Sequence, residues 1–192
     1  MVRLLAEKYD GICCGENYHD VLMGSIDPEH QPNLSYFDTM SGWQEFISRT
    51  PEAYETWITG CSREAAELEI IRLVQLSSEG KKIFVDSNIS VEILWEISDY
   101  HHVAILLSPQ EMSVSRFFDR PDAEKQFLYQ KLLEAPDPEA AIENFRKCLE
   151  RVNSQENYRL FAESGFFTYV RDENSTIDDA MAQIEGHFGL SR

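Results

Sequence analysis

Four short apolar runs most constrain how this chain of 192 residues can fold. Two of them, Lys82–Asp86 (KIFVD) and Val103–Leu107 (VAILL), are continuously apolar in their centres rather than alternating. Continuous runs are typical of strands that are covered on both faces of a parallel sheet. The other two runs are Gly11–Cys14 and Phe166–Val170. Because helical patterns separate the runs, the sequence predicts an α/β fold, built as a three-layer sandwich around a parallel sheet.

Helix signals lie between these runs. Asp137 followed by Pro138 combines an N-cap residue with proline at the first helical position, which predicts a helix to about Val152. Ser175, with Asp178 three residues later, is a variant capping box that predicts the start of the last helix. The apolar stripes expected to be buried are Ala66, Ile70, Leu73 and Val74 within a helix over Arg63–Leu76, and Ile177, Met181, Ile184 and Phe188 in the last helix.

The stretch from Tyr18 to Gly60 is longer than a plain crossover between two strands needs. Its length indicates a helical lobe (residues 18–60) that is inserted after the first strand of a single domain (residues 1–192). A substrate pocket is expected in this lobe. The anchors that suggest ordered structure in this lobe are Pro28, Pro32, Pro51, Trp43 and Trp57.

The composition is strongly acidic. With 34 Asp and Glu against 17 Lys and Arg, the net charge is −17, and a cationic surface for nucleic acid is not expected. An anionic small substrate would need a local cluster of Arg and Lys. No apolar run approaches the roughly 18 residues of a membrane span, and no signal peptide is recognisable. These features predict a cytoplasmic protein without a membrane partner.

The four cysteines show no metal-binding spacing. They are Cys13, Cys14, Cys61 and Cys148, and no CxxC pair occurs. Buried free thiols are therefore expected, with Cys13 and Cys14 on opposite faces of a strand.

Asp86 ends the apolar run KIFVD. A carboxylate at the carboxyl end of a parallel strand lies where open α/β folds bind ligands, and there it could bind Mg²⁺ directly or through water. Alternatively, Asp86 caps the turn that follows the strand. Both interpretations fit its position.

Arg116 and Arg120 follow the third run within a segment, residues 109–135, that could act as a lid. They are four residues apart and would share one face of a helix, where two guanidinium groups could stabilise a phosphoryl group during transfer. The alternative is ordinary surface pairing with nearby acids, which contributes little to stability.

Two further positions lie near presumed strand ends. The loop that contains Arg171, Asp172 and Asn174 opens the last helix, and its backbone amides could hold a polar ligand group or serve only as a cap. His19 lies beyond the first strand, close to the expected cleft. The five histidines show no metal spacing.

The order of these pieces resembles that of P-loop kinases of the nucleoside-monophosphate-kinase-like type. RLLAEKYD is similar to the helix that follows the GxxxxGK[ST] loop of that family, and KIFVD takes the place of its Walker B-type strand. SRFFDRPDAEKQF and GFFTYVRDENSTIDDAMAQIEGHFGL resemble its lid and its last strand and helix. The likeness is to a small bacterial branch of uncharacterised ATP-binding kinases and covers nearly the whole chain.

The resemblance implies ATP and Mg²⁺ as cofactors and a small molecule or nucleotide as phosphate acceptor. Asp86 would hold Mg²⁺, and Arg116 and Arg120 would act in catalysis together with Glu16. The loop of Arg171, Asp172 and Asn174 would flank the adenine. His19 and Arg49 would face the acceptor.

The chain departs from the family in having no GK[ST] sequence. The resemblance therefore implies that a central strand and a phosphate-binding loop should stand before Met1, and that residues 1–192 do not bind ATP tightly. In the family order 2-3-1-4-5, KIFVD and VAILL flank the missing strand. Either these two strands close on each other directly, or another segment, from this chain or a partner, fills the slot between them. Direct closure needs no second molecule and is the outcome we expect, with an exposed apolar surface that favours a homodimer. The rival hypothesis is a non-catalytic binding protein that retains the kinase fold.

Overall fold

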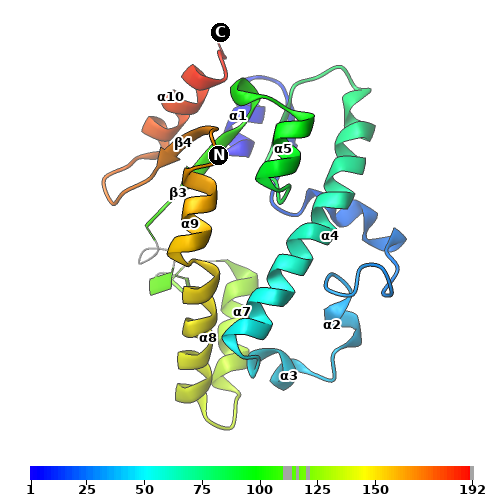
Figure 1. Cartoon of the computed structure of the whole chain (residues 1–192), viewed down its shortest axis with the longest axis vertical. Coiled ribbons are helices and arrows are strands. Elements are labelled where there is room, and N and C mark those ends of the chain that lie inside the picture. Colours follow the sequence, from blue (N-terminus) through cyan, green and yellow to red (C-terminus); the bar gives the residue numbers. More distant parts are fainter. Residues whose placement is uncertain (110–113, 116, 120–121, 191–192) are drawn as a thin grey trace.

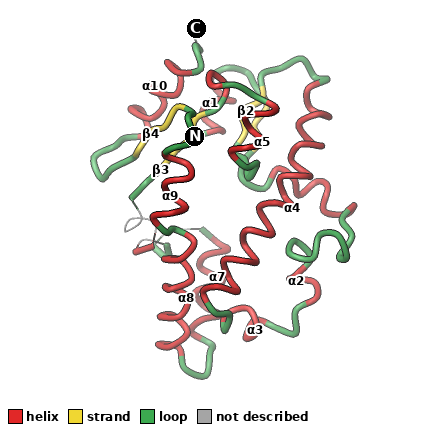
Figure 2. The backbone as a smooth tube through the Cα atoms, viewed as in Figure 1, coloured by secondary structure: helices red, strands yellow, loops and turns green. Residues whose placement is uncertain are grey.

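Helices make up most of the chain, and short strands contribute a smaller part (Figures 1 and 2). The computed structural model describes residues 1–109, 114–115, 117–119 and 122–190. Among these residues the α-helices are α1 (Val2–Lys8), α2 (Tyr36–Thr39), α3 (Trp43–Ile47), α4 (Pro51–Ser77), α5 (Val91–Ile97), α7 (Ala123–Leu133), α8 (Pro138–Val152), α9 (Gln155–Ala162) and α10 (Ile177–His187), with 3₁₀ helices η1 (Tyr18–Ser25) and η2 (Tyr100–His102).

Two pairs of parallel strands form the β-structure. β1 (Ile12–Cys14) pairs with β2 (Ile83–Val85), and β3 (Ala104–Leu107) pairs with β4 (Phe167–Val170). Each strand coincides, to within one residue at either end, with one of the predicted apolar runs. A mixed α/β chain with parallel strands is therefore confirmed.

The two pairs do not join into one sheet. The prediction that KIFVD and VAILL close on each other is wrong, because β2 pairs with β1, β3 pairs with β4, and no described residue of β2 pairs with β3. Each of these two strands consequently has one edge without a strand partner in the described part of the chain.

Helix packing explains why the edges stay apart. Leu5 of α1, Phe84 of β2 and Ile184 of α10 belong to one buried cluster. One turn further along α10, the ring Nε2 of His187 lies 2.9 Å from the carbonyl oxygen of Val103, just before β3. Because α10 contacts both strand pairs, its packing fixes their separation, and direct pairing would break these contacts.

A second and larger hydrophobic cluster lies among the helices. It joins α3, the first turns of α4, α7 and α8, and its buried members are Phe46, Ile47, Tyr54, Leu132, Ala135, Phe145, Cys148 and Leu149. The rings of Trp43 and Phe127 meet edge to face at 5.0 Å. Helix α7 of the 109–135 segment therefore shares a core with the 18–60 stretch.

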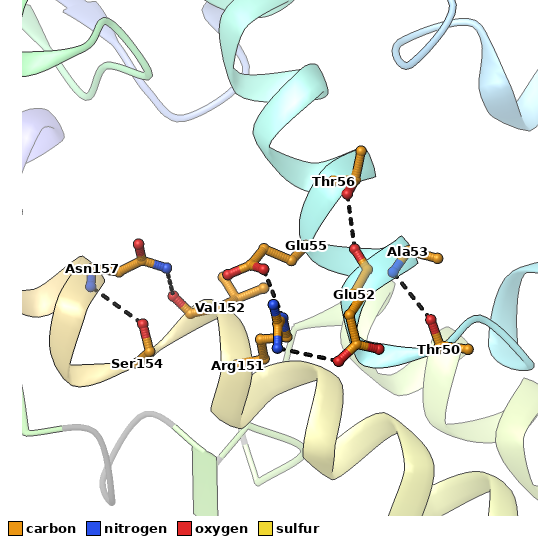
Figure 3. A network of polar contacts seen from close by, with 9 residues as sticks. All are labelled: Thr50, Glu52, Ala53, Glu55, Thr56, Arg151, Val152, Ser154 and Asn157. Carbon is orange, nitrogen blue, oxygen red and sulfur yellow. Dashed lines mark hydrogen bonds and ion pairs between the residues drawn. The ribbon is translucent and has the colours of Figure 1, made fainter.

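Helix α4 is longer than predicted. It begins at Pro51, where the side chain of Thr50 accepts a hydrogen bond from Ala53 N. Gly60 lies inside this helix, so the predicted end of the lobe falls within a continuous element. Figure 3 shows Arg151 of α8 reaching Glu52 and Glu55 near the start of α4, at 3.2 and 2.6 Å.

Two predicted stripe positions are wrong. Val74 is 68% exposed and Ile177 is 64% exposed. The buried face of α4 runs instead through Ala65, Leu68 and Leu76, and Val74 lies about 200° around the helix from Leu76. Ile177 is the first residue of α10 and lies beyond the cluster that buries Ile184.

The caps of α8 and α10 were predicted with different success. Asp137 caps α8 by accepting from Ala140 N, as predicted. The capping box of α10 is formed by Thr176 and Asp179, one residue later than predicted. The hydroxyl of Ser175 instead accepts from Asp172 N and donates to the Asp172 carboxylate within the preceding turn.

Candidate functional site

The loops that follow β1 and β2 bring several polar side chains to the carboxyl end of this strand pair. The register aligns Cys14 with Val85, and Asp86 N donates to Cys14 O at 2.8 Å. Asp86 and Glu16 therefore leave the same edge from neighbouring strands. Both are exposed, and neither carboxylate has a hydrogen-bond or ion-pair partner among the described residues. Two free carboxylates at a parallel strand end suit a hydrated divalent cation.

His19 is placed just below this edge in η1. It is only 6% exposed, and its Nδ1 lies 3.5 Å from Glu69 Oε1 of α4. Nδ1 has no partner that meets hydrogen-bond geometry within the described residues. The structure therefore brings His19 to the same region as Glu16 and Asp86, although its ring is largely covered.

Glu69 is the buried centre of this region. Its side chain is fully buried, and its carboxylate accepts hydrogen bonds from Ser87 Oγ at 2.8 Å and from Asn88 N and Nδ2 at 2.9 and 2.8 Å. Tyr18 donates to it from the other loop at 3.4 Å. Burying a carboxylate is costly unless donors surround it, and here they come from both strand-end loops.

Burial governs the titration of the neighbouring groups. It raises the pKa of the Tyr18 hydroxyl well above its ordinary value, and the negative charge of Glu69 raises it further. Tyr18 is thus a donor to Glu69 at neutral pH. Burial also raises the pKa of the Cys14 thiol, with Arg72 acting in the opposite direction.

The turn after β2 answers one question that the sequence left open. Ile89 N donates to Ser87 Oγ at 3.0 Å, and Glu69 holds Ser87 and Asn88. Ser87 and Glu69, rather than the side chain of Asp86, stabilise this turn. The carboxylate of Asp86 remains available to a ligand.

Arg49 lies away from the strand ends. Its guanidinium carbon is 3.8 Å from the centroid of the Tyr36 ring and 5.2 Å from that of Trp57. Its Nη1 is buried and lacks a hydrogen-bond partner among the described residues. Trp57 and Glu69 are twelve residues apart on α4, about 18 Å along the helix axis. The structure therefore does not bring Arg49 together with His19.

The loop after β4 is held mostly by its own contacts. Arg171 N donates to Leu107 O at 2.8 Å and so extends the pairing of β4 with β3. The carboxylate of Asp172 accepts from Ser175 Oγ and Asn174 N at 2.8 and 2.9 Å, which lowers its pKa. This loop lies at the end of the other strand pair from Asp86. Its amide and guanidinium side chains are exposed.

Arg116 and Arg120, predicted to act on a transferred phosphoryl group, lie outside the described residues. Within the described ranges, no group of three or more His, Cys, Asp or Glu side chains is arranged to hold a metal ion. Mg²⁺ is commonly bound by one or two carboxylates together with water and substrate phosphates, so the donor set of Asp86 and Glu16 fits that mode of binding.

Sequence reasoning missed Glu69 and its counterpart Glu64. Glu64 is 1% exposed and accepts from Asn33 N, Asn33 Nδ2 and Leu34 N in the 18–60 stretch. Neither glutamate belongs to the apolar stripe that was predicted for this helix. The available signal was their spacing, because Glu69 lies seven residues before the buried Leu76 and therefore on the same face.

Comparison of the chain with models of known protein families, with curated protein sequences and with solved structures gave no match. In the part of the chain that the structure describes, every helix is too short or too polar to cross a lipid bilayer.

Proposed function

We propose that the chain forms most of a P-loop-kinase-like phosphotransferase, whose reaction is ATP-dependent phosphorylation of a small molecule or nucleotide. The observation that carries this proposal is the pairing of the strands. If strand 1 is removed from the order 2-3-1-4-5, two separate parallel pairs remain, 2 with 3 and 4 with 5. The pairs β1–β2 and β3–β4 have this arrangement and this chain order.

The open edges of β2 and β3 mean that the proposal requires a further strand between them. An unpaired strand edge presents N–H and C=O groups that another strand can satisfy. A central strand between these edges would lead into a phosphate-binding loop at the amino end of α1. Since residues 1–192 contain no GK[ST] sequence, the proposal needs that strand and loop from polypeptide outside them.

The proposed roles follow from position. Asp86 would bind Mg²⁺, which would bridge the phosphates and neutralise the charge that develops on them. Glu16 would contact the acceptor beside it, with His19 beneath. Arg116 and Arg120 would supply positive charge, and the loop of Arg171, Asp172 and Asn174 would flank the adenine.

The test uses the protein as its own gene produces it, purified through a C-terminal tag. Intact mass is expected to exceed the 22.2 kDa of residues 1–192, and Mg²⁺-dependent phosphoryl transfer from ATP is expected. Asp86→Asn and Arg120→Ala should each lower turnover by about 10²-fold. A native chain of 22.2 kDa that does not bind ATP would contradict the proposal.

The second candidate is a non-catalytic binding protein that retains this fold. The observation in its favour is again the unpaired edge of β3, where Leu106 is 49% exposed. Such an edge can bind an extended segment of a partner by strand addition. The native mass and the ATP assay separate the two candidates.

A further inference from the structure

We propose that Glu69 is the positioning residue of the candidate site, a single buried carboxylate that fixes the loop after β1 relative to the loop after β2. The tie between the loops rests on observed contacts alone. Its consequence for cation binding rests on the proposed function of Asp86.

The contacts to the loop after β2 are short. Ser87 Oγ, Asn88 N and Asn88 Nδ2 all lie within 2.9 Å of a carboxylate oxygen of Glu69. Ser87 directly follows Asp86. The direction in which the Asp86 side chain leaves the strand therefore depends on a turn that Glu69 holds.

The contacts to the loop after β1 are longer but come from two consecutive residues. The hydroxyl of Tyr18 lies 3.4 Å from Oε2, and Nδ1 of His19 lies 3.5 Å from Oε1. Glu16 is two residues before Tyr18. Because Glu69 belongs to a long helix, it gives both loops one common and rigid reference point.

Glu64 provides a matched control on the same helix. It is equally buried and also accepts from a backbone amide and an asparagine side chain, at Asn33. Its partners, however, are Asn33 and Leu34, on a loop that carries neither Asp86 nor Glu16. Glu69→Gln and Glu64→Gln should therefore disturb packing in similar ways but differ at the candidate site.

The first measurement is amide hydrogen exchange. The amides of Tyr18 and Asp20 donate to the carbonyls of Gly15 and Asn17, not to Glu69. Relative to the core amide of Leu149, they should exchange about tenfold faster in Glu69→Gln and at the wild-type rate in Glu64→Gln. If only Asn88 responds to Glu69→Gln, the carboxylate merely caps one turn and the proposal is wrong. If Glu69→Gln does not fold, Tyr18→Phe replaces it, and an unchanged Asp20 amide then overturns the proposal.

The second measurement uses Mn²⁺ as a paramagnetic probe of the loop amides. Broadening is expected at Gly15 and Ser87, and Asp86→Asn should abolish it. Glu69→Gln should weaken the apparent affinity by about tenfold, whereas Glu64→Gln should leave it unchanged. Wild-type affinity in Glu69→Gln, with binding lost in Asp86→Asn, would refute the positioning role. Wild-type affinity in Asp86→Asn would refute the proposed metal ligand instead, and the exchange rates would still decide the role of Glu69.

Discussion

The indole ring of Trp95 lies flat on the phenyl ring of Phe166, with centroids 3.9 Å apart and planes 10° from parallel. Trp95 Nε1 also donates to Ser164 O at 2.9 Å. Trp95 belongs to α5, which follows β2, whereas Phe166 directly precedes β4. This contact therefore links the two strand pairs, which share no strand-to-strand hydrogen bonds in the described part of the chain.

Removing this link should destabilise the protein. Trp95→Ala is expected to lower the free energy of unfolding by about 2 kcal/mol, through loss of the stacking and of one hydrogen bond. Trp95→Phe retains an aromatic ring and should lose only about 1 kcal/mol. Urea denaturation measures both values. Equal losses in the two variants would mean that the hydrogen bond, not the stacking, joins the strand pairs.

Gly60 should resist a substitution that normally stabilises helices. A Cβ at this position in α4 would overlap the side-chain amide of Asn33, which Glu64 holds in place. Gly60→Ala is therefore expected to cost about 1–3 kcal/mol despite the better helix propensity of alanine. Gly186 in α10 has open space around it. Gly186→Ala should stabilise by about 0.5 kcal/mol, and the same sign for both variants in thermal unfolding would contradict the close approach of Asn33.

Acid should lower the stability of the 18–60 stretch by protonating the carboxylate of Glu45. Hydrogen bonds from the hydroxyl and amide of Ser41, and then from Tyr36, lower the pKa of Glu45 from 4.5 to about 2. A depressed carboxyl pKa means that this contribution to stability is present above pH 4.5 and is lost as the pH falls toward 2. Between these values the melting temperature of the wild type should fall more steeply than that of Glu45→Gln. Parallel curves would rule out the contribution.

In residues 1–192 alone, the open edge of β3 should promote self-association. Leu106 is 49% exposed on this strand, and a lysine on an open edge disfavours pairing with another chain. Leu106→Lys is expected to raise the dissociation constant of the dimer by about tenfold in sedimentation equilibrium, a change of about 1.4 kcal/mol. Val74→Lys on α4, where the residue is 68% exposed, is the control and should have no effect. Equal effects would exclude the strand edge as the interface.

Residues 1–192 alone should bind ATP·Mg²⁺ only weakly. The sequence lacks the lysine and backbone amides of a GxxxxGK[ST] loop, and we expect a Kd above about 1 mM, equivalent to about 4 kcal/mol. Isothermal titration calorimetry provides the measurement. Micromolar binding would mean that the chain has a nucleotide site of a different kind.

The strands and one helix start were predictable because their signals are local. Short apolar runs marked all four strands, and Asp137 with Pro138 marked the start of α8. The start of α10 was off by one residue because Ser175 and Thr176 can both cap a helix. Only the contact between Ser175 and Asp172 decides between them.

The arrangement of the strands and the buried acids depended on tertiary contacts. Local sequence does not reveal that His187 and Ile184 hold α10 against both strand pairs. The polar environment of Glu69 comes from loops that are distant in sequence, so its burial could not be inferred from α4 alone. Glu16, His19 and Asp86 nevertheless lie near one strand end, since parallel strands bring their carboxyl ends together.

The length of α4 has a mechanical consequence. Its 27 residues span about 40 Å and carry Glu64 beneath one loop and Glu69 beneath two others. The helix therefore runs as one element from the helical cluster to the strand ends. If it rotated by about 5° about its end near the strands, its opposite end would move by roughly 3.5 Å. Movement of the 18–60 stretch and rearrangement of the loops around Asp86 would then be a single motion.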